Sequence, residues 1–385
     1  MKKIAFNLLG DSNWQAGFIY MTNLLRALQV TERNEVRLLL LGALDTYVPE
    51  ELKNLIDETL VRPSYNRWTA AWFIDRMSKK LLHRDLLLDR FLRQHQVSVV
   101  AFDDPPRSSR IPSLSWLPDF QHVHLSEMFS LEECLARDRS FMCIAEKATK
   151  VLLLSESVKR DFEAFAPEHA HKARVLSPVT YIPTTTYEAN TESIAELYHL
   201  PKKFIYLPNQ FWKHKNHATV FQSVRLLKDK GTHVIVVCSG NPIDYRHPNY
   251  FSELLQMASR LRIRNQIIFL GLIPREHVFM LIRQSICVLN PSLFEGFGLT
   301  TEEAQSLGKL SLLSDIPVHR EQNPPRAAFF QPKDHEDLAN KLEEIWHNEP
   351  PGPDLRSESE SRETLITRLR GFGESFISVV NEVIQ

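Results

Sequence analysis

The chain has 385 residues, 43% hydrophobic and 24% charged, which is ordinary for a globular protein and long enough for about two domains with cores of their own. Its formal net charge of −1 excludes a global field that would recruit nucleic acid or another polyanion. The four cysteines have no metal-binding spacing, so we expect no disulfide framework, no structural zinc and a reducing, cytoplasmic environment.

The first residues combine a basic start with a short apolar run, 4–9, and polar Asp11 follows soon after. This pattern lacks the long apolar region and small-residue cleavage site of a signal peptide, so it predicts a buried first strand. No stretch approaches about 18 consecutive apolar residues, so no membrane span is expected.

Short apolar runs alternate with segments of helical periodicity in the first half of the chain. The segments 18–29 and 131–149, for example, have the spacing of helices. Such alternation predicts parallel sheets with helices on both faces. The expected strands are 4–9, 36–41, 97–102, 114–117 and 151–154.

A proline- and threonine-rich stretch, 177–187, interrupts the alternation and is typical of a linker. We therefore predict one α/β domain over 1–185 and a second over 186–362. The segment 348–362 is rich in Pro, Ser and Glu and predicts an exposed connection to a final helix, 363–385, that packs back on the first domain. The strands expected in the second domain are 204–207, 234–238, 267–270, 286–289 and 310–313.

The loop after 286–289 holds two carboxylates and two glycines before a predicted helix. Gly296 and Gly298 permit close backbone approach, and the start of the helix offers free amide groups, so the loop suits an anion or a polyhydroxylated ligand. Glu295 precedes the glycines, and Glu303 is expected in the first helical turn. Thr300 and Glu303 also have the spacing of a capping box, which is an alternative role for Glu303.

The sequence Pro291-Ser-Leu-Phe-Glu-Gly-Phe-Gly-Leu followed by Glu303 resembles the E-x7-E motif of family 4 retaining glycosyltransferases, including bacterial polysaccharide and exopolysaccharide enzymes. The resemblance implies the GT-B fold, in which two Rossmann-like, doubly wound domains face each other across a cleft. It also implies roles for the loop: Glu295 faces the donor sugar, the backbone amides of Phe297, Gly298 and Leu299 meet sugar and phosphate, and Glu303 binds the ribose.

A second polar loop follows the expected strand 204–207 and contains Lys213, His214 and Lys215 before an amphipathic helix. Cations at a strand-to-helix turn can neutralise a diphosphate, although a solvated basic turn is the alternative. In the resembling family this loop carries an Arg and a Lys. Lys215 matches the Lys, whereas Asn209 or Gln210 stands where the Arg is usual, so the resemblance implies donor contacts from Asn209 and Lys215 with Lys213 or Arg275 as substitutes for the missing cation.

Two further post-strand loops of the second domain resemble parts of the donor site. Gly240 ends the expected strand 234–238, and Gly271 follows the expected strand 267–270. By resemblance, Gly240 belongs to the donor site, and Leu272 and Ile273 meet the nucleobase through backbone groups. Strand-end glycines are also simple turn formers.

The first domain offers the candidates for the chemical step. Gly17 resembles the second member of a glycine pair whose amide reaches the donor phosphate, and Ala16 replaces the first. Asp119 matches the Asp of a His-Asp pair, but Pro118 stands in the usual place of the His. His122 follows in a Pro-Asp-x-Gln-His pattern, so Asp119 or His122 is expected at the donor sugar or acceptor hydroxyl. The acidic pair at 103–104 is expected to cap a loop.

The segment 62–93 is unusually basic, with eight Lys or Arg against three Asp and with interleaved Trp68, Trp72 and Phe73. This pattern predicts peripheral contact with an anionic membrane surface. The alternative is a helix whose aromatic residues pack in the core and whose charges are solvated.

Together these features predict a metal-independent, retaining hexosyltransferase without a cofactor. It would move a hexose from a nucleotide sugar, with UDP-glucose favoured, to a hydroxyl of a polysaccharide or lipid-linked oligosaccharide. A GDP-mannose-dependent mannosyltransferase is the alternative donor class. A degenerate sugar-nucleotide-binding protein and a GT-B epimerase are the rivals from other classes, and no nucleic-acid partner is expected.

Overall fold

The computed structural model describes residues 1–9, 15–32, 36–42, 48–62, 68–82, 85–104 and 110–384. Contacts between residues divide the chain into two compact units. Unit 1 comprises Met1–Phe120, Leu131–Tyr181 and Ile366–Gln385, and unit 2 comprises Gln121–Ser130 and Ile182–Leu365. The chain therefore enters unit 2 briefly at Gln121–Ser130 before it returns to unit 1.

Unit 1 is built on a parallel sheet in the order β3-β2-β1-β4-β5-β6-β7. Its central strands are buried on both faces, because helices cover a parallel sheet from both sides. The strands are β1 Lys2–Asn7, β2 Val36–Gly42, β3 Glu58–Val61, β4 Val99–Ala101, β5 Ser113–Leu117, β6 Lys150–Leu153 and β7 Ala173–Val175. The helices are α1 Gln15–Val30, α2 Glu50–Lys53, α3 Ala70–Leu82, α4 Leu86–Gln94, α6 Leu131–Lys147, α7 Glu156–Phe165 and the 3₁₀ helix η3 Pro167–Lys172.

Unit 2 contains a second parallel sheet in the order β10-β9-β8-β11-β12-β13. The strands are β8 Ile205–Leu207, β9 Val236–Ser239, β10 Ile267–Gly271, β11 Cys287–Asn290, β12 Ser311–Ser314 and β13 Ala327–Phe330. The helices are α5 Gln121–His124, η2 Ser126–Met128, α8 Thr184–Glu188, α9 Glu192–Leu197, η4 Lys213–Lys215, α10 His217–Asp229, α11 Tyr250–Arg260, α12 Arg275–Gln284, α13 Leu299–Ser306, α14 Pro317–Gln322 and α15 His335–Asn348. The expected amphipathic helix is α10, whose Val220, Val224 and Leu227 are fully buried.

Each apolar run predicted as a strand forms one, which confirms the α/β class with two parallel sheets. The structure adds β3, β7 and β13, which the sequence did not predict. All three lie at the end of a sheet, where a strand has a single neighbour. Edge strands are short and partly exposed, so they lack the continuous apolar run that marks a central strand.

The last helix, α16 Leu355–Ile384, begins earlier than predicted. The expectation of a connection through 348–362 is wrong from Leu355 onward, because the chain is already helical there, whereas the expected exposure holds for most side chains of 355–362. Glu358 is the buried exception in this stretch, because it pairs with the buried guanidinium of Arg283.

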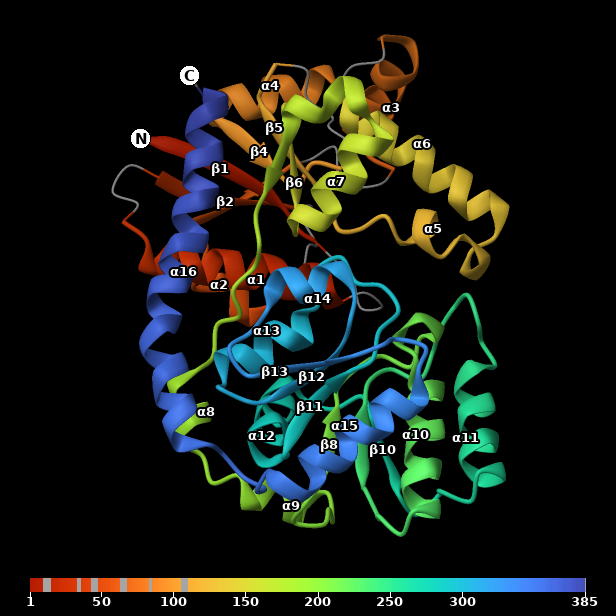
Figure 1. Ribbon diagram of the computed structural model, residues 1–385. Helices are drawn as coiled ribbons and strands as arrows, with labels where there is room; N and C mark the ends of the chain where they lie inside the picture. Colours follow the sequence, from red (N-terminus) through yellow and green to blue (C-terminus); the bar gives the residue numbers. More distant parts are fainter. Residues whose placement is uncertain are drawn as a thin grey trace. The chain divides into compact units, whose positions relative to one another are not determined.

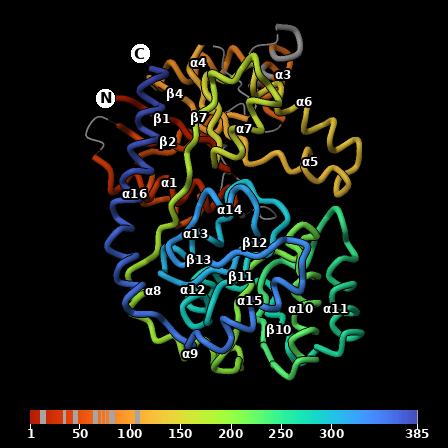
Figure 2. The backbone as a smooth tube through the Cα atoms, viewed as in Figure 1, coloured from red at the N-terminus to blue at the C-terminus, as the bar shows by residue number. Residues whose placement is uncertain are grey.

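From Ile366 onward, α16 packs within unit 1. Figures 1 and 2 show this part of the helix beside β1, and Phe376 stacks on Phe6 with 5.7 Å between ring centroids. Gly373 permits the close approach to α1, because a Cβ there would lie 2.2 Å from Thr31 Oγ1. No helix in the described parts of the chain is long and apolar enough to cross a membrane.

The basic segment 62–93 is only partly described, since 63–67 and 83–84 lie outside the described residues. Arg62 is buried and pairs with Asp85 at 2.7 Å, so it adds nothing to the surface charge. The interpretation that the aromatic residues pack in the core is wrong for Trp68, which is 77% exposed, and for Phe73, which is about half exposed.

Candidate functional site

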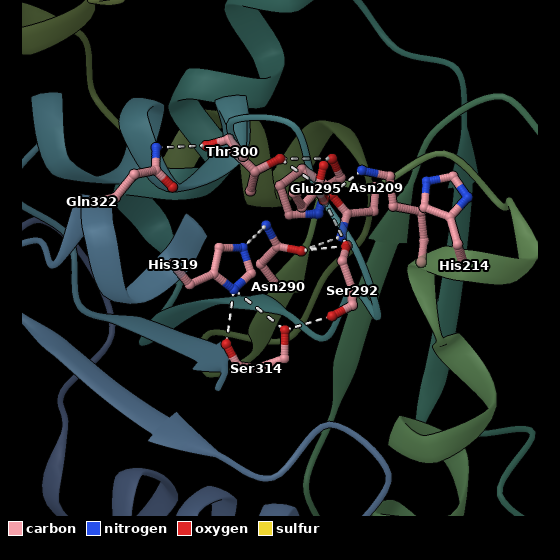
Figure 3. Close-up of polar contacts among 12 residues, drawn as sticks. Asn209, His214, Asn290, Ser292, Glu295, Thr300, Ser314, His319 and Gln322 are labelled. Carbon is pink, nitrogen blue, oxygen red and sulfur yellow. Dashed lines mark hydrogen bonds and ion pairs between the residues drawn. The ribbon is translucent and has the colours of Figure 1, made fainter. Parts of the chain in front are cut away.

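The strand order of unit 2 places a topological switch point between β8 and β11. Successive strands run outward from β8 toward β10 on one side and from β11 toward β13 on the other. Ligands of open α/β sheets bind beyond the carboxyl ends of the strands at such a point. The loop that follows β8, 208–216, holds Lys215. The loop that follows β11, 291–298, holds Glu295 (Figure 3).

Lys215 and Glu295 form an ion pair across this switch point. The Nζ–Oε1 distance is 2.5 Å, and the side chains are only 15% and 11% exposed. Burial alone would raise the pKa of Glu295. The opposing effects are larger: the charge and hydrogen bond of Lys215, the hydrogen bond from Ser292 and the charge interaction with His319. The pKa of Glu295 therefore lies below its ordinary value. Lys215 therefore does not belong to a solvated basic turn, and the site holds a buried ammonium next to a carboxylate.

A hydrogen-bond network holds the carboxylate of Glu295 in place. Ser292 Oγ lies 2.6 Å from Glu295 Oε1 and 2.8 Å from Asn290 Oδ1. Asn290 is the last residue of β11 and is fully buried. The orientation of Glu295 is thus fixed from the strand that precedes its loop (Figure 3).

His319 of α14 fixes the orientation of the Asn290 amide in turn. Its Nδ1 lies 2.9 Å from the Ser314 carbonyl and donates there, which leaves Nε2 to accept from Asn290 Nδ2 at 3.2 Å. Burial lowers the pKa of His319, in keeping with a neutral ring. Asn290 Oδ1 is then free to accept from Asn209 Nδ2 at 3.0 Å, so one network joins the loops after β8 and β11 (Figure 3).

The backbone turn before α13 depends on Gly298. This residue is the N-cap of α13 with φ +80°, and its carbonyl accepts from Gln322 Nε2 at 3.2 Å. A Cβ on Gly298 would lie 2.8 Å from Gln322 Oε1. Both the positive φ and the contact favour glycine here.

Gly298→Ala should lower the free energy of unfolding by about 1–3 kcal/mol, because alanine is strained at this φ and displaces Gln322. Gly231→Ala is the matched control, since Gly231 has φ +91° and nothing within 4 Å of an added Cβ. Urea unfolding should show the larger loss for Gly298→Ala. Equal losses in the two variants would mean that the Gln322 contact is not significant.

Glu303 lies in the second turn of α13, so its expected place in the first turn is wrong. The first turn holds Glu302 instead. Thr300 is not the N-cap, and its Oγ1 hydroxyl lies 3.2 Å from Asn209 Oδ1, so the capping box does not form. Glu303 is 4% exposed and pairs with Arg275 at 2.8 Å. Burial raises its pKa, and Arg275 opposes that shift only in part.

Gly240, directly after β9, and Gly271, the last residue of β10, lie side by side at the same edge of the sheet. The Gly240 amide donates to the Gly271 carbonyl at 2.8 Å, and a Cβ on Gly240 would lie 2.5 Å from the Asn209 carbonyl oxygen. Leu272 is 60% exposed, and Ile273 is half-buried. Contact of Leu272 and Ile273 with a nucleobase stays a prediction.

The candidates for the chemical step belong to both units. Gly17 is buried in the first turn of α1, and Asp119 pairs with Arg137 at 3.2 Å; both residues belong to unit 1. His122 is buried in α5 of unit 2. The stretch 10–14 before Gly17 lies outside the described residues. The roles of Gly17, Asp119 and His122 stay predictions.

No group of three or more His, Cys, Asp or Glu side chains that could hold a metal ion occurs among the described residues. Asp104 of the acidic pair accepts from the Trp116 amide at 2.9 Å, as a loop cap does. Independence of a metal ion stays a prediction.

Sequence reasoning missed the residues that support this site. Asn290 and His319 are 29 positions apart and meet only because β11 and β12 are neighbours, so no local pattern marks them. Arg246 lies in the loop after β9 and is nearly buried, without a motif around it. The position of Asn290, directly after an apolar run, was the available indication.

The whole chain is similar to solved glycosyltransferases. It aligns with a glycosyltransferase from Rickettsia africae ESF-5 with a TM-score of 0.68 and 16% identity, covering 100% of this chain and 99% of the other. It aligns with Anabaena Alr3699/HepE, solved in complex with UDP and glucose, with a TM-score of 0.64 and 15% identity over 100% and 98% of the two chains. These similarities confirm the GT-B fold class.

The family follows from residues 190–366, which match the model described as "Glycosyl transferases group 1". The matched range covers most of unit 2. The match confirms the family resemblance drawn from the loop 291–303, which lies inside the matched range.

Two curated bacterial proteins are similar in sequence. The O-antigen chain mannosyltransferase RfbU of Salmonella typhimurium is 25% identical over 50% of this chain, and the serotype-specific mannosyltransferase WbdA of Escherichia coli is 23% identical over 53%. The matches span 53% and 25% of those two proteins, so they cover about half of the first and a quarter of the second.

Proposed function

We propose that the protein is a retaining hexosyltransferase that binds a nucleotide sugar at the β8–β11 switch point of unit 2. The observation that carries the proposal is the pairing of Lys215 with Glu295 beside a second buried carboxylate, Glu303, at the carboxyl edge of a doubly wound sheet. Through charge-assisted hydrogen bonds, a cation binds a diphosphate, and carboxylates accept from sugar hydroxyls.

The donor is proposed as either UDP-glucose or GDP-mannose. The sequence favoured UDP-glucose, whereas both curated relatives are named mannosyltransferases, which makes GDP-mannose equally plausible. Chromatography of the nucleotide released from each donor distinguishes the two. Release of GDP alone would favour the mannosyltransferase, and binding without release of either nucleotide would favour a degenerate, non-catalytic protein.

In the proposed reaction the bond between the anomeric carbon and the diphosphate breaks, and the acceptor hydroxyl forms a new bond from the same face. Lys215 stabilises the negative charge that grows on the departing diphosphate. Glu295 orients the donor sugar, and the hydroxyl proton leaves with the diphosphate. Glu303 binds the ribose, and the backbone amides of 297–299 complete the anion site.

Asp119→Ala and His122→Ala test which side chain serves the reacting centre. We expect one of them to lower kcat by about 10²–10⁴-fold, as loss of a group at the reacting centre does. Initial rates with saturating donor measure the effect, and thermal unfolding controls for folding. Turnover at the wild-type level excludes the substituted residue from chemistry, and wild-type turnover in both variants contradicts this assignment.

We further propose that α3 of unit 1 touches an anionic membrane surface, which suits a lipid-linked acceptor. Phe73, Ile74 and Met77 are exposed on one side of this helix, Trp68 is exposed just before it, and exposed Arg76 adds a cation. Lys79 and Lys80 continue the basic sequence. Exposed apolar groups beside cations are typical of helices that lie on a membrane.

Replacing Phe73, Ile74 and Met77 together by serine should weaken binding to phosphatidylglycerol vesicles by about tenfold or more. The reason is that burying these apolar side chains in the membrane contributes favourable free energy to binding. Vesicle sedimentation measures this binding. Ile243→Ser, at an exposed apolar position of unit 2, is the control. Equal sedimentation of wild type and triple variant would contradict membrane contact through α3.

A further inference from the structure

The segment Gln121–Ser130 belongs to unit 2, although both flanking stretches belong to unit 1. It contains α5 and η2 and carries His122, one of the two candidates for the reacting centre. A short segment stays with a unit only if specific contacts hold it. Two such contacts come from one side chain, Arg246 of the loop after β9.

The guanidinium of Arg246 contacts three polar partners and is almost fully buried. Its Nη1 donates to Gln121 Oε1 at 3.0 Å, its Nε lies 3.4 Å from Asp244 Oδ1, and its Nη2 lies 3.4 Å from His214 Nδ1. Burial, helped by Lys215, lowers the pKa of His214 well below its ordinary value, so this ring stays neutral and can accept. The side chain of Arg246 is only 4% exposed.

Aromatic rings enclose the same guanidinium. It lies 4.7 Å from the centroid of Phe129 and 5.2 Å from that of Trp212. Phe129 belongs to the segment, and Trp212 belongs to the loop after β8, so Arg246 stands between the two. Cation–π contacts of a desolvated guanidinium are favourable, and a planar group can hold both rings and hydrogen bonds at once.

A second contact joins the segment to the loop after β11. His124 stacks on Phe294 with 4.9 Å between ring centroids and 28° between ring planes. Phe294 directly precedes Glu295. The segment with His122 is thus attached to both loops that hold Lys215 and Glu295.

We propose that Arg246 is a positioning residue for glycosyl transfer: through Gln121 and Phe129 it holds the His122 segment on the loops that bind the donor. This inference rests on the proposed function. Arg246 acts here through other residues, because its donors face Gln121, Asp244 and His214 inside the protein. A positioning role affects turnover more than donor affinity, since the geometry of the reacting groups changes while the donor contacts remain.

The test compares Gln121→Ala, Arg246→Lys and the double variant in steady-state transfer. Each single variant should lower kcat by about tenfold and leave the KM for the donor within about threefold of wild type. The double variant should be no worse than the poorer single variant, because both remove the same contact. Arg225→Ala, which breaks an exposed pair with Asp229 in the same unit, should leave kcat unchanged.

Three results would overturn the inference. A rise in donor KM at constant kcat in Arg246→Lys would mean that Arg246 binds the donor directly. A wild-type kcat in Gln121→Ala would mean that the contact between Arg246 and Gln121 does not matter for transfer. Additive losses of kcat in the double variant would mean that the two residues have separate roles. If Arg246→Lys unfolds at the assay temperature, Gln121→Ala alone decides. An inactive wild type would instead refute the proposed function, and that result is separate from all of these.

Discussion

Lys215→Ala should lower kcat/KM for the nucleotide-sugar donor by about 10²–10³-fold, the loss expected when one preorganised group that stabilises developing negative charge is removed. In the proposed reaction, Lys215 faces the departing diphosphate from a poorly hydrated position, where its charge is weakly screened. Initial rates of nucleotide release at several donor concentrations measure the effect. Lys202→Ala is the control, because Lys202 is exposed and precedes β8, outside the loop 208–216. Equal kcat/KM in Lys215→Ala and wild type would remove Lys215 from the site.

The same substitution has a signature in the pH dependence of stability. In the wild type, the pKa of Glu295 is lowered, so its interactions stabilise the fold above the ordinary value of 4.5 and that stabilisation is lost as pH falls through the lower folded-state pKa. Without Lys215, burial dominates and the pKa of Glu295 should rise. Urea unfolding of Lys215→Ala should therefore show a stability that decreases as pH rises toward neutrality, relative to wild type.

Glu303→Gln should weaken donor binding by about 10²-fold and leave the protein at least as stable as the wild type near pH 7. The loss of affinity comes from the charged acceptor that the ribose hydroxyls would use. The stability follows from the sign of the pKa shift. Because the folded-state pKa of Glu303 is raised, its contribution favours folding at low pH and is lost as pH rises through that pKa. A neutral amide avoids this loss.

Calorimetric titration of the donor and thermal unfolding at pH 7 measure both effects in one preparation of Glu303→Gln. Glu276→Gln is the control, since Glu276 is exposed in the first turn of α12 next to Arg275. A capping role would instead lower stability by about 1 kcal/mol and spare affinity. That combination of results would contradict the proposed ribose contact.

The sequence predicts the central strands of both sheets because each is buried on both faces and reads as a continuous apolar run. It fails at β3, β7 and β13, whose edge positions need no such run. It also fails at the start of α16, where buried Glu358 depends on Arg283, a partner 75 residues away that no local pattern shows.

The candidate site, too, could be predicted from the sequence only in part. Glu295, Gly298 and Lys215 follow strands directly and stand in a recognisable motif, so their place at one sheet edge could be anticipated. The position of Glu303 in the second turn of α13 could not be anticipated, because the sequence also allows Thr300 to cap the helix. Arg246 was missed because Gln121 of α5 and His214 of the loop after β8 are far from it in sequence and meet it only in the folded unit.

The proposed function requires that unit 2 bind a nucleotide sugar at the β8–β11 switch point. Isothermal titration of the full chain with UDP-glucose and with GDP-mannose tests it most directly, with Lys215→Ala and Glu303→Gln titrated alongside. We expect saturable binding of one donor to the wild type and a large loss of that binding in both variants. The absence of binding for both donors, or equal affinity in wild type and both variants, would contradict it.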